Sequence, residues 1–104
     1  MPSAPPSILT DQNGATIGAT MKGDAHIAAT DDNKLLVMVT VAITPDGRPE
    51  KTFKFGFARP LEDGVHVIDQ DVAFVFTGYA PVMRRLYVEI GVTGLELTVR
   101  SLRL

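Results

Sequence analysis

The sequence lacks cysteine and tryptophan, and it has few of the residue types that carry out chemistry in enzymes. Among 104 residues there are three serines and two histidines. Without cysteine, disulfide bonds, thiol catalysis and cysteine-based metal sites are excluded. Ser3, Ser7 and Ser101 lack the flanking glycines of a nucleophile elbow, so serine catalysis is not expected.

Long apolar runs and an excess of positive charge are also missing. The longest apolar stretch, residues 35–43, is too short to cross a bilayer as a helix. The N-terminus has neither the charged start nor the apolar core of a secretory signal, so we expect a protein in the cytoplasm or in a phage particle. The net charge of −2 gives no reason to expect binding to nucleic acid or insertion into a membrane.

Apolar side chains recur at every second position, which is the periodicity of β-strands. The series is clearest in residues 35–43, 53–57, 72–76, 86–92 and 95–99. The pattern predicts a soluble, single-domain, all-β protein: an antiparallel β-sandwich of immunoglobulin-like architecture with about seven to nine short strands. A small β-barrel is the alternative.

The positions of proline, glycine and asparagine predict an N-terminal arm and several turns. Three prolines indicate that residues 1–7 form a flexible or extended arm before a domain at residues 8–104. Turns are predicted at Asn13-Gly14 and at Lys22-Gly23-Asp24, and a hairpin at Thr93-Gly94.

Two further irregularities are predicted inside the strands. The acidic segment around Asp69 and Asp71 predicts a kink between two short strands. After Val99 the apolar positions shift to Leu102 and Leu104, which predicts either a β-bulge near Arg100-Ser101 or a terminal strand that changes partners.

The segment 35–43 is apolar on both of its faces, because Leu36, Met38 and Ala42 alternate with the main apolar series. Such a strand lies at the centre of a sheet covered on both sides, or its second face meets another subunit. This pattern predicts a homo-oligomer whose interface uses either a sheet face that includes Met38 or a terminal strand.

A second candidate contact region is segment 78–85, which we interpret as an irregular loop with a helical turn starting at Pro81. Tyrosine, arginine and methionine gather there, and these residue types are enriched in interface hot spots. Together with Met38, the candidate interaction residues are Tyr79, Val82, Met83, Arg84, Arg85 and Tyr87.

These observations favour a non-catalytic protein-interaction or assembly module that binds itself or another protein. A virion or apparatus component and an inhibitor-type binder both fit this description, and no cofactor or metal is predicted. One alternative is a small-ligand-binding barrel with an apolar pocket. Its lining would be Met38, Phe53, Phe55, Phe57, Phe74 and Phe76. Another alternative is a small enzyme that uses His66 with Asp69 or Asp71.

Overall fold

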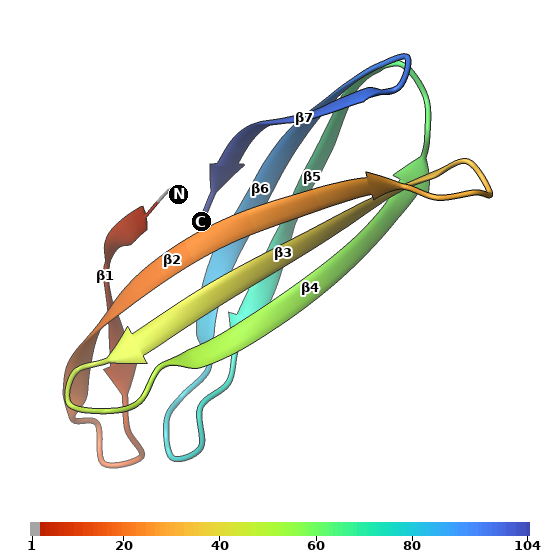
Figure 1. Ribbon diagram of the computed structural model, residues 1–104. Helices are drawn as coiled ribbons and strands as arrows, with labels where there is room; N and C mark the ends of the chain where they lie inside the picture. The colour runs from red at the N-terminus through yellow and green to blue at the C-terminus, as the bar shows by residue number, and fades with distance from the viewer. Residues whose placement is uncertain (1–2) are drawn as a thin grey trace.

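The computed structural model describes residues 3–104, with side chains from Leu9 onward, and the regular structure in this part is entirely β-strand (Figure 1). The strands are β1 (Ser3–Thr10), β2 (Thr16–Ala29), β3 (Lys34–Pro45), β4 (Lys51–Pro60), β5 (Gly64–Phe74), β6 (Val82–Thr93) and β7 (Glu96–Arg103). They form two antiparallel sheets with the orders β1-β2-β3-β4 and β5-β6-β7. The predicted all-β antiparallel sandwich is confirmed.

The two sheets face each other along their length and give an elongated molecule of 52 × 21 × 20 Å (Figure 1). The four-stranded sheet curls around the three-stranded one. Its longest strand, β2, has 14 residues, and β3 and β6 have 12 each. Within residues 3–104 there is no helix that is long and apolar enough to cross a membrane.

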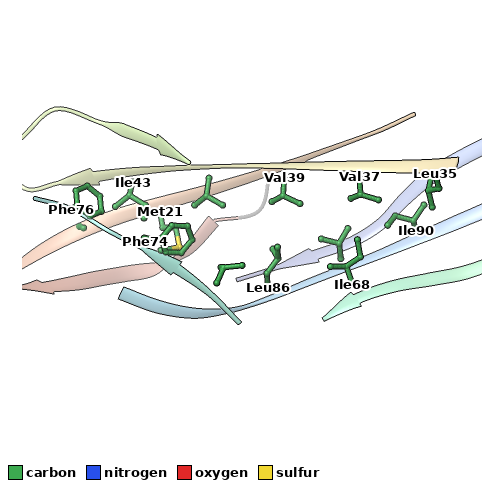
Figure 2. Close-up of a cluster of buried hydrophobic side chains, with 14 of the residues drawn as sticks. Met21, Leu35, Val37, Val39, Ile43, Ile68, Phe74, Phe76, Leu86 and Ile90 are labelled. Carbon is green, nitrogen blue, oxygen red and sulfur yellow. The ribbon is translucent and has the colours of Figure 1, made fainter. Parts of the chain in front are cut away.

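A single apolar core fills the space between the sheets (Figure 2). Each strand contributes every second side chain, as the alternation predicts. From β3 these are Leu35, Val37, Val39, Val41 and Ile43, and from β6 Leu86, Val88, Ile90 and Val92. On the β4–β5 side the rings of Phe53 and Phe55 meet Phe74 edge-on, at centroid distances of 5.1 and 5.7 Å.

On the opposite side of the sandwich, the beginning of β1 and the end of β7 both lie beside β2 (Figure 1). Ser3 of β1 lies opposite Lys22, while Leu102 and Leu104 pack over Gly23, the next residue of β2. The predicted turn at Gly23 is therefore wrong, because β2 runs straight through it. A Cβ atom at Gly23 would lie 2.8 Å from Leu104 Cδ1, so glycine serves close packing here rather than a turn.

Strand β1 begins at Ser3, so much of the predicted arm is paired with β2 as extended chain. Met1 and Pro2 lie outside the described residues. The division into an arm at residues 1–7 and a domain at residues 8–104 stays a prediction.

Several of the predicted turns and irregularities are confirmed. The Asn13-Gly14 turn closes the β1–β2 hairpin with a left-handed Gly14 (φ 82°) and a hydrogen bond from the Asp11 amide to the Ala15 carbonyl. Thr93-Gly94 begins the β6–β7 hairpin. The register of β7 omits Arg100, which is the predicted β-bulge.

Two predictions about the three-stranded sheet are wrong. Strand β5 passes through Asp69 and Asp71 without a break, because both side chains fall on its outward positions and need no kink to reach solvent. Strand β6 begins at Val82, where it pairs with Phe74, so residues 82–85 form strand rather than a loop or helical turn.

Candidate functional site

The outer surface of the four-stranded sheet carries an apolar centre. We call this surface the Met38 face. It consists of Lys22, Asp24, His26 and Ala28 of β2, Leu36, Met38, Thr40 and Ala42 of β3, and Thr52, Lys54, Gly56 and Ala58 of β4. All of these alternate with the inward-facing core residues of the same strands.

Leu36 and Met38 form the centre of the Met38 face. Their exposed fractions are 38% and 43%, whereas Leu35, Val37 and Val39 beside them are fully buried. The side chain of Met38 leans over Gly56, since a Cβ atom there would lie 3.1 Å from the Met38 sulfur. The second apolar face of β3 is therefore exposed, and the described part of the chain does not cover it.

Polar side chains surround this apolar centre. His26 and Asp24 form a pair on β2, with Nε2 and Oδ2 3.1 Å apart. Next to them the short side chains of Thr40 and Ala42 leave a shallow depression of about 330 Å³, which Lys22 also lines. An apolar centre with a polar rim is the usual anatomy of a protein–protein interface.

Met83, Arg85 and Tyr87 lie on the outer surface of the other sheet, on the far side of the molecule from Met38. The guanidinium of Arg85 donates a hydrogen bond from Nε to Asp69 Oδ1 at 2.6 Å and lies 3.4 Å from Asp71 Oδ1. The Tyr87 ring stacks under the Arg103 guanidinium at 4.2 Å, and its hydroxyl donates to Glu89. These charged groups neutralise one another within the surface.

The remaining candidates of segment 78–85 do not share that surface. Val82 and Arg84 alternate with Met83 and face inward with Leu86, and both are half-buried. Tyr79 lies in the preceding loop, where it bridges to Asp11 and its ring lies 5.3 Å from the Arg48 guanidinium. The structure thus divides the seven sequence-predicted residues among two outer faces, the interior and a loop.

The structure does not bring together the residues of the enzyme alternative. His66 is on the inward side of β5, and its Nε2 donates to the Glu62 carbonyl at 2.6 Å. Asp69 and Asp71 are on the outward side of the same strand and interact with Arg85. Within the described residues, no group of three histidines or carboxylates is placed to hold a metal ion.

The proposed lining of an apolar ligand pocket is also divided. The phenylalanine rings of β4 and β5 pack against one another in the core, and Phe53 also meets Phe76 at 5.4 Å. Met38 lies on the opposite face of the sheet. These six side chains therefore do not line one common cavity.

Sequence reasoning missed the polar members of the Met38 face. Asp24 and Lys54 are 30 positions apart in the sequence and become members of one surface only through the pairing of β2 and β4 with β3. Their outward positions could have been found from alternation, but their alignment needs the strand register.

Comparison of the chain with family models, curated proteins and solved structures gave no match. The site must therefore be interpreted from its own geometry.

The Asp69–Arg85 pair makes a testable electrostatic prediction. The hydrogen bond from Arg85, together with its positive charge, lowers the pKa of Asp69 below its ordinary value of 3.8. We expect Arg85→Gln to raise the pKa of Asp69 toward that value. NMR titration of the Asp69 carboxyl carbon between about pH 2 and pH 6 would measure the change. Arg59→Gln, on the other sheet, should leave the titration unchanged.

The same ion pair predicts the direction in which folding stability changes in acid. Because the folded-state pKa of Asp69 is lowered, its contribution to stability is present above pH 3.8 and is lost as the pH falls through the folded-state pKa. The Arg85→Gln protein should lose less stability over that interval than the wild type. An equal loss of stability in both proteins would contradict the statement that Arg85 lowers the pKa of Asp69.

Proposed function

We propose that this protein is a non-catalytic self-association module that assembles through the Met38 face. The observation that carries the proposal is the uncovered apolar face of β3, with Leu36 and Met38 at the middle of the sheet. Side chains of this kind at the centre of a sheet leave apolar area in water, and burying it in a contact is favourable. The role is that of a structural component built from copies of itself, in the cytoplasm or in a phage particle.

The alternative contact surface, around Met83, offers weaker support for association. Its arginines and carboxylates already pair with one another, as Arg85 does with Asp69. Removing such pairs from water has a desolvation cost that a new partner must compensate. The Met38 face has a continuous apolar centre instead.

Two matched substitutions test the proposal. Met38→Glu places a charge at the centre of the Met38 face, and Met83→Glu makes the same change at a residue that is 62% exposed on the other sheet. Light scattering after size-exclusion chromatography should give a mass that is a multiple of 11.2 kDa for the wild type and for Met83→Glu. Met38→Glu should give 11.2 kDa alone, because its carboxylate would be desolvated in the contact.

Circular dichroism should show the same β-sheet spectrum for all three proteins, since both substituted side chains are on outer surfaces. A wild type that remains at 11.2 kDa over the whole concentration range would refute self-association. If Met83→Glu dissociates the oligomer and Met38→Glu does not, the contact between subunits is on the three-stranded sheet.

A further inference from the structure

One row of the Met38 face carries opposite charges at its two ends. Asp24 of β2 pairs in register with Thr40 of β3, and Thr40 with Lys54 of β4, so the three form one row across the sheet. Neighbouring strands are about 4.8 Å apart, which separates Asp24 and Lys54 by roughly 10 Å. Within the described part of the chain Lys54 has no ion pair, and Asp24 pairs with His26.

The neighbouring rows are apolar at the same central position. Met38 lies between His26 and Gly56, and Leu36 lies between Ala28 and Ala58. The outer positions of β3 are thus apolar at Leu36, Met38 and Ala42, and the Thr40 row between them has an acid on the β2 side and a base on the β4 side. Lys22 lies in the next row, beside Ala42, where the β4 side carries the uncharged Thr52. The flanking alanines and Gly56 are small. In the Leu36 and Met38 rows, therefore, no side chain of β4 projects beyond those of Leu36 and Met38.

Such a surface is complementary to itself under one symmetry operation. A two-fold axis that lies above β3 and parallel to it exchanges the β2 side with the β4 side while it keeps each row in place. Asp24 then faces Lys54 of the partner subunit, and Lys54 faces Asp24 of the partner subunit. Leu36 and Met38 lie on the axis and each meets its own copy, as an isologous interface requires.

An axis across the strands does not give this match. If it passes over the Thr40 row, Asp24 meets its own copy and so does Lys54, which brings like charges together. If it passes over the Met38 row, Asp24 lies opposite an alanine, because the Ala28 row and the Asp24 row change places. Like charges in contact are unfavourable at an interface, so the axis along β3 is the one that the charges select.

We therefore infer that the partner bound by the Met38 face is a second copy of this chain, related by a two-fold axis along β3, with Asp24 against Lys54 of the partner subunit at two equivalent places. This inference rests on the proposed self-association and specifies its geometry. Face-to-face sheets pack with their strands roughly aligned, which this arrangement satisfies.

Charge exchange tests the register directly. Asp24→Lys alone should place two lysines together at both equivalent places, and Lys54→Asp alone should place two aspartates together. Each single variant should have a dimer dissociation constant at least about tenfold above that of the wild type. The double variant, Asp24→Lys with Lys54→Asp, restores opposite charges and should dimerise like the wild type.

The decisive experiment mixes the two single variants. One copy then carries lysine at both positions and the other carries aspartate at both, so the two copies match each other and neither matches itself. Light scattering and native mass spectrometry should show a 1:1 heterodimer in the mixture and mainly monomer in each variant alone. Glu96→Lys, an exposed change at the start of β7, should leave dimerisation of the wild type unaffected.

The possible failures can be told apart. If the wild type associates and Met38→Glu dissociates it, but the mixture shows no preference for the heterodimer, the two-fold register is refuted and self-association stands. If the wild type and the mixture are both monomeric at every concentration, both proposals are refuted. Unchanged circular dichroism spectra of the single variants exclude unfolding as the cause of dissociation.

Discussion

Phe74→Ala is expected to lower the free energy of unfolding by about 3–5 kcal/mol. Phe74 is fully buried near the end of β5, and its ring contacts Phe53 and Phe55 of the other sheet. No strand pairing joins β4 to β5, so these ring contacts connect the two sheets on that side of the molecule. Alanine would leave a cavity and remove both edge-to-face contacts.

Urea denaturation followed by circular dichroism would measure this loss. Val75→Ala is the matched control, because Val75 is the next residue and its side chain is 56% exposed. The control should change the free energy of unfolding by about 0.5 kcal/mol or less. If Phe74→Ala cost no more than Val75→Ala, the ring would not connect the sheets in the way that the structure describes.

Val39→Asp should abolish cooperative folding, whereas Met38→Asp should leave the fold intact. Val39 is fully buried at the centre of β3, between Ala25 and Phe55 in the neighbouring strands. An unpaired carboxylate in such surroundings costs several kcal/mol, which is comparable with the 5–15 kcal/mol that stabilises a typical domain. The side chain of Met38 is on the outer surface, where a carboxylate keeps its water.

Heteronuclear NMR spectra of the two variants at low protein concentration would test whether each variant is folded. The Met38→Asp spectrum should be as dispersed as that of the wild type, and the Val39→Asp spectrum should have collapsed. The comparison depends only on the direction of two adjacent side chains. Loss of folding in both variants would mean that Met38 belongs to the core of the chain, and the proposed Met38 face would be lost with it.

The sequence by itself determined that the chain is built from antiparallel strands and which side of its main apolar strands faces the core. Alternation is a local property, because successive side chains of a strand point to opposite faces whatever lies beside it. The inner series of β3 and β6 and the bulge at Arg100 follow from it, and the Asn13-Gly14 turn follows from the ease with which glycine adopts a positive φ; all are confirmed.

Local patterns misled where distant contacts decide the backbone. Gly23 resembles a turn residue, but it is placed by Leu102 and Leu104, which are about 80 positions away and need the space that a side chain would fill. Val82 begins β6 because it pairs with Phe74, although the proline and glycine just before it resemble a loop. In both places the cause lies outside the segment itself.

Only the tertiary structure decided which residues share a surface. The sequence places Met38 outward on its strand, but strand pairing puts Asp24, Thr40 and Lys54 in one row and Met83 on the opposite side of the molecule. Register is set by the packing of whole sheets, since a shift of one residue would turn every apolar side chain of a strand to the other face. The charge pattern around the apolar centre, and with it the proposed two-fold contact, exists only once that register is formed.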